Sequence, residues 1–329
     1  MRLKIIISIS TILTLNLISN ELHITIPTPP KPTEPIEINL KNGNEDISDR
    51  TIKFSKRYPP NYTPLEERIS RDVDGREGVG DITNGRVSVN LVGGYLDVDE
   101  VKRRLEKADF KILALLPLDG NGTLQSIVFT DAILKRLASE PKRGFLATLR
   151  VVVDSRDRYI SFINPIYISK AFLQDKFNME MAERLLTKIR DSFPDLKNSV
   201  DRFKFQALSD YSFMKGMPKY QNMVEVANGK NLIQKAKSSS RVVFIEKIDD
   251  SSTIIGIKLS DMISQFPDKI GRKNGVALPY PLLIEGDRAY ILDPKYYISI
   301  NYPDLKMEQF MAIGTIPDAI VEESKSIFK

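Results

Sequence analysis

The apolar pattern of this chain passes through one order of strands and helices twice, and this repetition limits the possible fold more than any other feature. From residue 86 onward, apolar residues alternate as in a strand and then recur at helical spacing behind Asp97, which can cap a helix. Further patterns predict two strands, a helix, two strands and a third helix, and the same order begins again near residue 223. The sequence therefore predicts two tandem α+β domains, over residues 86–200 and 223–329, with a connector over 201–222.

Register markers favour a duplication. Gly144 and Gly275 precede equivalent strands, and Pro165 and Pro294 follow the next strand of each copy. Nearly the same number of residues separates the two glycines as separates the two prolines, which chance rarely produces. The strands expected around these markers are 145–153, 159–168, 276–284 and 289–292. Because each copy would leave part of its sheet uncovered, we expect the two copies to cover one another.

Basic pairs recur just before the two glycines, as Lys142-Arg143 and Arg272-Lys273. They could contact an anionic lipid or glycan. The simpler interpretation, which we favour, is that they follow the second helix of each copy, where cations complement the helix dipole and glycine caps the helix.

The segment RGFLATLRVVV at 143–153, followed by Asn164-Pro165, resembles the domain-of-unknown-function family 302. The second copy is similar through GVALPYP at 275–281 and Asp293-Pro294. This resemblance implies a β-α-β-β-α-β-β-α unit like that of the TATA-binding protein, with an antiparallel sheet covered by helices. Because some family members are dimers, a tandem pair would form a pseudo-dimer within one chain. The family implies no established activity, catalytic residue or cofactor.

Residue composition excludes several kinds of chemistry. The chain has no Cys and a single His, so thiolate nucleophiles, disulfides, the usual zinc sites and Ser/His/Asp triads are excluded or nearly so. Carboxylate or lysine chemistry and an oxygen-ligand cation site remain possible. No carboxylate pair has a spacing that would place both groups in one cleft. We therefore expect no enzyme, no cofactor and no metal, with a carboxylate-dependent hydrolase or transferase of the periplasm as the alternative.

Charge argues against nucleic acid as a partner. Lys and Arg number 48 against 43 Asp and Glu, which gives a net charge of +5. Nucleic-acid binding needs basic residues gathered on one face or helix, which the sequence does not show. We expect no nucleic-acid partner.

The first 20 residues are typical of an export signal. Arg2 and Lys4 precede an apolar run over 5–18, and Ser19 could supply the small residue before a cleavage site. The run is short for a membrane span, although an uncleaved anchor remains an alternative. Residues 21–85 include PTPPKPTEP and are expected to be proline-rich and largely irregular. These features predict a periplasmic or secreted protein.

Six residues are candidate ligand contacts. Asn164 and Asp293 occupy equivalent strand ends, where two such side chains could ligate a cation or hold a ligand. We favour the structural interpretation, in which Asn or Asp before proline ends a strand through local hydrogen bonds. The full set is Arg150, Tyr159, Asn164, Tyr280, Tyr290 and Asp293.

The connector is dense in large apolar residues. Such a segment forms either a surface for a partner or the packing that joins the two domains, and we favour the packing. The residues concerned are Tyr211, Phe213, Met214, Met217 and Tyr220.

Together these features predict an exported, non-enzymatic binding or scaffold protein of the cell envelope. Its partner would be a small apolar ligand, such as a lipid held between sheet and helices, or another envelope protein. The chain would be a monomer with an internal pseudo-dimer, or a homodimer.

Overall fold

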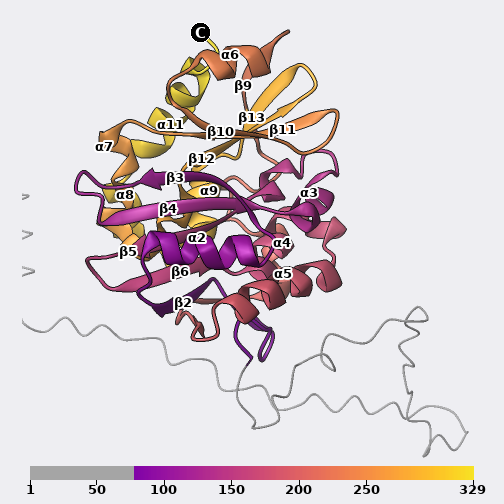
Figure 1. Ribbon diagram of the computed structural model, residues 1–329. Helices are drawn as coiled ribbons and strands as arrows, with labels where there is room; N and C mark the ends of the chain where they lie inside the picture. Colours follow the sequence, from indigo (N-terminus) through magenta and orange to yellow (C-terminus); the bar gives the residue numbers. More distant parts are fainter. Residues whose placement is uncertain (1–77) are drawn as a thin grey trace, which may run out of the picture. The chain divides into compact units, whose positions relative to one another are not determined.

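The computed structural model describes residues 78–329, which form a mixed α+β fold with antiparallel sheets (Figure 1). The α+β class expected from the sequence is thereby confirmed. The expected signal peptide and most of the proline-rich segment lie outside the described residues. None of the helices within 78–329 has the length and apolar character needed to cross a membrane.

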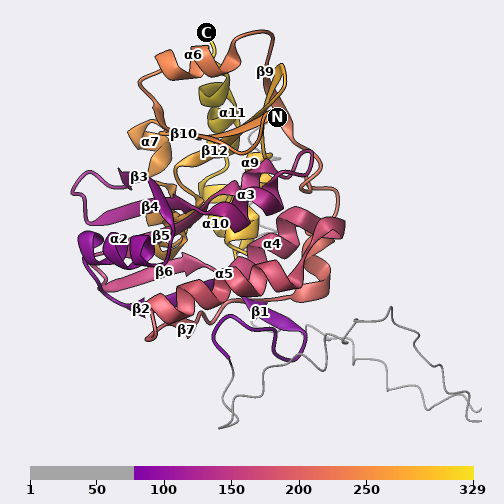
Figure 2. The same cartoon turned by 45° about the vertical axis from the view of Figure 1, so that its right-hand side comes forward.

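The first half of the described chain builds a six-stranded antiparallel sheet. Its strands, in spatial order, are β3 (Lys111–Pro117), β4 (Leu124–Thr130), β5 (Leu149–Asp154), β6 (Tyr159–Ile163), β2 (Asn90–Gly94) and β7 (Lys197–Asn198). The helices of this half are α2 (Val98–Lys107), α3 (Ala132–Ala138), α4 (Pro165–Leu173) and α5 (Met179–Ser192). Figure 1 shows α2 in front of this sheet, and Figure 2 shows α4 and α5 beside one another. A small separate sheet pairs β1 (Arg86–Ser88) with β8 (Arg202–Lys204).

Two helices on this sheet, α2 and α3, begin at an aspartate cap. Asp97 accepts a hydrogen bond from the backbone N–H of Glu100, and Asp131 accepts one from Leu134. Both are N-caps that satisfy a backbone donor of the first turn. Beneath α2 and α5 the core contains a series of aromatic rings, with centroids of successive pairs 5.0, 6.2 and 4.7 Å apart. The rings belong to Phe110, Phe129, Phe162 and Phe193.

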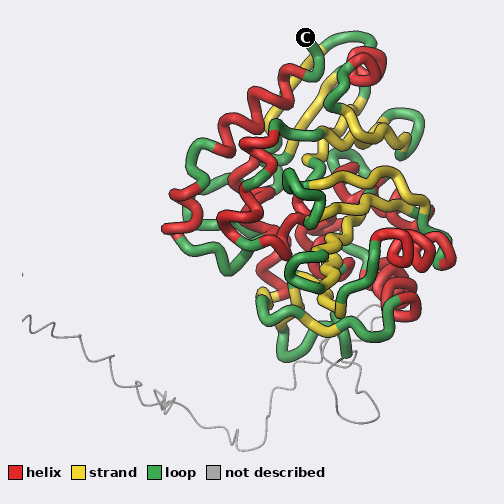
Figure 3. Tube along the Cα trace, turned by 60° about the vertical axis from the view of Figure 1, so that its left-hand side comes forward, coloured by secondary structure: helices red, strands yellow, loops and turns green. Residues whose placement is uncertain are grey.

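The second half builds a five-stranded antiparallel sheet. Its strands, in spatial order, are β10 (Val242–Lys247), β11 (Ser252–Ile257), β12 (Tyr280–Glu285), β13 (Arg288–Ile291) and β9 (Val224–Asn228). Its helices are α6 (Leu232–Ser238), α7 (Asp261–Ser264), α8 (Phe266–Ile270), α9 (Pro294–Asn301), α10 (Met307–Ala312) and α11 (Ile316–Ser326). Across the two halves, helices lie on either side of the strands (Figure 3).

Strand order is the same in the two large sheets. In the first sheet β2 lies beside β6, and in the second β9 lies beside β13 in the same way. In each, the next strand along the chain, β3 or β10, forms the far edge. Only β7 has no counterpart in the second sheet.

Each half packs a short 3-10 helix against the sheet of the other. The helix η1 (Gly144–Ala147) contacts β11 and β12, whereas η4 (Arg272–Ala277) contacts β4, β5 and β6. A Cβ on Gly144 would overlap Cδ1 of Leu283, and a Cβ on Gly275 would lie 3.2 Å from Cγ2 of Val152. Val152 and Leu283 stand equally far along the chain from the two glycines, so the two contacts are reciprocal. A side chain at either position would force neighbouring side chains to shift, which accounts for glycine there.

These 3-10 helices correct two expected strands. The segments 145–153 and 276–284 do not form single strands, because β5 begins only at Leu149 and β12 only at Tyr280. In the first half, η1 is buried throughout, against the other half as well as its own, so it shows no polar face. A continuous apolar run of this kind looks the same in a buried strand and in a buried turn.

The strand expected over 159–168 is also wrong in its second part. β6 ends at Ile163, and Asn164 then caps α4 by accepting a hydrogen bond from the backbone N–H of Ile166. Asp293 caps α9 in the same way, through Lys295. Both helices carry proline at their start, which suits a first turn that has no use for that N–H.

The basic pairs do not follow helices capped by Gly144 and Gly275, and one residue of each pair contacts the other half. α3 ends at Ala138 with Ser139 as its C-cap, so Gly144 does not cap it. The backbone N–H of Lys142 donates to Glu285 at 2.6 Å, and the guanidinium of Arg272 bonds Asp154 at 2.7 Å. The interpretation based on the helix dipole is therefore wrong.

A buried carboxylate also joins the halves near the sheet edges. Glu246 of β10 has a side chain only 6% exposed, and it pairs with Lys111 of β3 at 2.6 Å and with Lys135 of α3 at 2.7 Å. Burial alone would raise the pKa of Glu246, but the hydrogen bonds from the two lysines outweigh it and leave the pKa below its usual 4.5.

Replacing Glu246 with Gln should destabilise the fold by about 1–2 kcal/mol at neutral pH. Because the folded-state pKa is lowered, the carboxylate stabilises the fold above pH 4.5 and loses this effect as the pH falls through the folded-state pKa. Urea unfolding at neutral pH and near pH ~3 should therefore show the difference between wild type and variant shrinking in acid. A difference that stays constant over this range would contradict the assignment.

Candidate functional site

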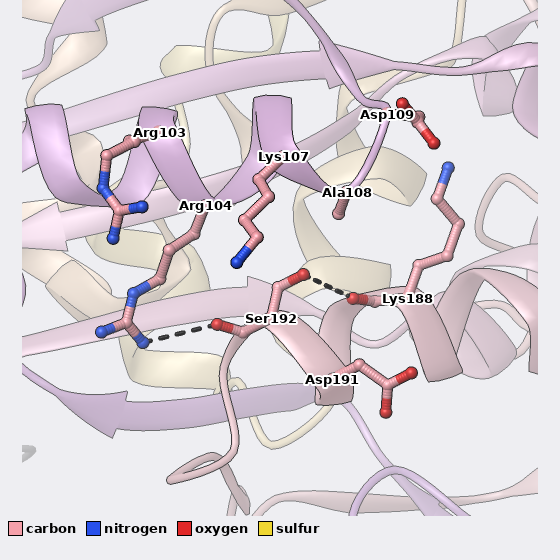
Figure 4. A pocket seen from close by; sticks show the side chains of 8 residues that line it. All are labelled: Arg103, Arg104, Lys107, Ala108, Asp109, Lys188, Asp191 and Ser192. Atoms are coloured by element: carbon pink, nitrogen blue, oxygen red, sulfur yellow. Dashed lines mark hydrogen bonds between the residues drawn. The ribbon is translucent and has the colours of Figure 1, made fainter.

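A groove of about 690 Å³ lies between the C-terminal ends of α2 and α5. Figure 4 shows its lining from both helices. The lining residues are Arg103, Arg104, Lys107, Ala108, Asp109, Lys188, Asp191 and Ser192. We call this the α2–α5 groove. Its volume falls within the range of ligand pockets, and its lining is mostly polar and charged.

Two guanidinium groups of the groove share one carboxylate. Arg103 bonds both oxygens of Glu100 at 2.8 Å, and Nε of Arg104 bonds Oε1 of Glu100 at 2.6 Å. The hydrogen bonds from Arg103, and then those from Arg104, lower the pKa of Glu100 to about 2. The carboxylate is thus ionised at any physiological pH and offsets one of the two positive charges.

Arg104 also connects the two helices. Its guanidinium donates to the backbone carbonyl of Ser192, at 3.4 Å, and lies 5.7 Å from the ring centre of Phe193 (Figure 4). The hydroxyl of Ser192 in turn donates to the carbonyl of Lys188 at 2.9 Å. These contacts fix the distance between α2 and α5, and thereby the width of the groove.

The two lysines of the groove differ in their partners. Lys188 pairs with Asp131 at 2.6 Å and lies 4.1 Å from the ring centre of Phe110. The positive charge of Lys188 is therefore already paired with an aspartate. Lys107 has no ion-pair partner within residues 78–329, and Figure 4 shows its side chain reaching from α2 toward Ser192. Asp109 and Lys188 lie at the end of the groove away from Arg103.

The cation-rich end of the groove therefore presents Arg103, Arg104 and Lys107, and the carboxylate of Glu100 pairs with the two arginines only. Such an arrangement can hold a phosphate, sulfate or carboxylate group through charge-assisted hydrogen bonds. Cations in the last turn of a helix also complement the helix dipole, which accounts for part of this pattern without a ligand. Within residues 78–329, no group of three or more His, Cys, Asp or Glu side chains could hold a metal ion.

The six candidate ligand residues are not brought into one pocket. Asn164 and Asp293 are N-caps, and the amide of Asn164 also donates to the carbonyls of Gly80 and Ser88. Arg150 is buried between the halves and donates to the carbonyl of Pro279, while the hydroxyl of Tyr280 donates to that of Leu292. These contacts give four of the six a structural role.

The remaining two candidates lie on β6 and β13. Tyr159 is beside Asp154, and burial together with this carboxylate raises the pKa of its hydroxyl. Tyr290 lies with the ammonium of Lys142 5.7 Å from its ring centre. Neither tyrosine lines a groove described here.

The connector residues lie mainly in internal contacts. Tyr211 donates to the carbonyl of Ser299, and Tyr220 donates to that of Lys142. Phe213 stacks on Phe310 of α10, with centroids 5.0 Å apart. Met217 packs partly buried against the core, and Met214 is 40% exposed. Four of the five thus take part in internal contacts.

Sequence reasoning missed the α2–α5 groove. Arg103, Arg104 and Lys107 come from a single helix, and their spacing was a visible signal. Lys188 lies far along the chain, and only the packing of α5 against α2 brings it to the same groove. No protein-family model, no curated protein and no solved structure matches this chain.

Proposed function

We propose that this chain is an exported, non-enzymatic binding protein of the cell envelope that holds an anionic group in the α2–α5 groove. The observation that carries the proposal is the cation-rich end of that groove, where three cationic side chains lie together and one carboxylate pairs with only two of them. Lys107, which has no ion-pair partner within residues 78–329, would be the first contact of the ligand. Export is inferred from residues 1–20 alone.

We further propose that the halves are two copies of one unit, joined as a pseudo-dimer. Their sheets share one strand order, and each inserts a glycine-containing 3-10 helix against the other. Reciprocal contacts of this kind are typical of two-fold symmetric dimers. The resemblance to family 302 belongs to the same proposal. A tandem pair adds surface to the molecule and needs no catalytic chemistry.

Removing the positive charge of the groove should weaken anion binding. In a calorimetric titration with pyrophosphate at low salt, Lys107→Gln should reduce affinity about fivefold, since an exposed charge pair contributes ~1 kcal/mol. The double variant Arg103→Gln/Lys107→Gln should bind at least ~tenfold more weakly.

Lys102→Gln is the matched control, because Lys102 lies on the same helix, outside the groove, and pairs with Asp99 at 3.8 Å. Its affinity should equal that of the wild type. Equal losses in Lys102→Gln and Lys107→Gln would mean that pyrophosphate binds diffusely to a charged surface, and the proposal would fail.

A further inference from the structure

A second groove lies between α6 and the sheet of the second half. Its volume is about 590 Å³, and it shares no lining residue with the α2–α5 groove. We call it the α6 groove. Its lining residues are Ile233, Lys237, Ile245, Lys247, Asp249, Asp250, Ser251, Thr253, Ile284 and Gly286.

The floor of the α6 groove is apolar and belongs to the sheet. Ile284 of β12 pairs with Thr253 of β11, which pairs with Lys247 of β10, so the three lie side by side on one face. Ile245 occupies the next position of β10 on that face. Ile233 of α6 forms the opposite wall and is 38% exposed.

The rim carries two lysines and two aspartates, and Lys237 is the lysine without an ion-pair partner among residues 78–329. The carboxylate of Asp249 accepts hydrogen bonds from the backbone N–H groups of Ser251 and Ser252, within the turn to which it belongs. Asp250 pairs with Lys247 at 2.6 Å. Lys237 lies one helical turn after Ile233, on the same side of α6, and has no ion-pair partner within residues 78–329. The ammonium group of Lys237 therefore lies at the edge of the groove, next to its apolar floor, without an ion-pair partner within residues 78–329.

We propose that the α6 groove binds the acyl chain of an anionic amphiphile, such as a fatty-acid carboxylate. The chain lies over Ile245, Thr253 and Ile284, and the carboxylate pairs with Lys237. This site and its ligand differ from those proposed for the α2–α5 groove. The two proposals are therefore tested independently of one another.

The absence of tryptophan from the chain gives a direct test. In Ile233→Trp, the single indole would report on the groove, and dodecanoate added below its micelle concentration should shift its emission to the blue in a saturable way. Met262→Trp is the control, because Met262 is 81% exposed on α7 and does not line the groove. Calorimetry of the unmodified chain with dodecanoate should give the same affinity.

Ligands of different chain length test the apolar floor, and ligands with different headgroups test the role of Lys237. Octanoate, decanoate and dodecanoate should bind with affinities rising about tenfold for each pair of methylenes. Lys237→Gln should weaken dodecanoate severalfold and leave dodecanol unchanged. No saturable shift in Ile233→Trp, an equal shift in Met262→Trp, or tighter binding of dodecyltrimethylammonium than of dodecanoate would overturn the proposal.

Discussion

Replacing Arg272 with Met should destabilise the fold by about 3–5 kcal/mol, because it leaves a buried negative charge without its partner. The Arg272 side chain is only 5% exposed and pairs with Asp119, Asp154 and Asp268, with Asp157 at 3.9 Å. The Asp154 side chain is fully buried. Urea unfolding at pH ~7 should show the loss as a lower midpoint with an unchanged slope.

Two further variants separate lost charge compensation from lost packing. Arg156→Gln should cost less than ~0.5 kcal/mol, because Arg156 pairs with Asp157 while 55% exposed. Adding Asp154→Asn to Arg272→Met should recover part of the stability, since it removes the charge left uncompensated. If the double variant is no more stable than Arg272→Met alone, the large loss has another cause.

Acid should also weaken the ion pair between Arg272 and Asp119. Burial alone would raise the pKa of Asp119, but hydrogen bonds from Thr123, Leu124 and Arg272 leave it below its usual 3.8. A lowered folded-state pKa means that the carboxylate stabilises the fold above that value and ceases to do so as the pH falls through the folded-state pKa. The ion pairs of Asp119 and Glu246 both join one half to the other, so acid weakens the contacts between the halves.

The sequence predicted those elements that have a polar side. α2 buries Val101 and Leu105 and exposes the residues between them, so its helical period was visible, and Asp97 marked its start. The partly exposed strands β3 and β10 were visible as well, whereas β4 and β11 are buried along nearly their whole length and were indicated by short apolar runs. Wherever one face meets solvent, the period of the apolar residues identifies the element.

Buried elements between the halves were not predictable in this way. In α4 all residues but Lys170 are buried, and in α9 all but Lys295, so neither shows a helical period. The available signal was local, since Asn164-Pro165 and Asp293-Pro294 each place an N-cap before a proline that suits a first helical turn. The α2–α5 groove was not predicted for a different reason. Lys188 lines it only because two helices that are distant in the sequence pack together.

Gly144→Val should destabilise the fold by about 3 kcal/mol, through overpacking where η1 meets the sheet of the second half. A Cβ at Gly144 would overlap Cδ1 of Leu283 and lie 3.0 Å from Cδ1 of Ile248. Gly120→Val is the matched control, because a Cβ at Gly120 meets nothing within 4 Å, and its stability should stay within ~0.5 kcal/mol of wild type. Thermal unfolding of both variants measures the difference.

A double-mutant cycle locates the origin of that loss. Leu283→Ala alone should cost about 2–4 kcal/mol, because it opens a cavity in a buried strand. Combined with Gly144→Val, it removes the group that the new side chain strikes, so the double variant should lose ~1–3 kcal/mol less than the sum of the single losses. Strict additivity would show that Gly144 and Leu283 do not constrain one another. The close approach of η1 to β12 would then not be a contact that joins the two halves.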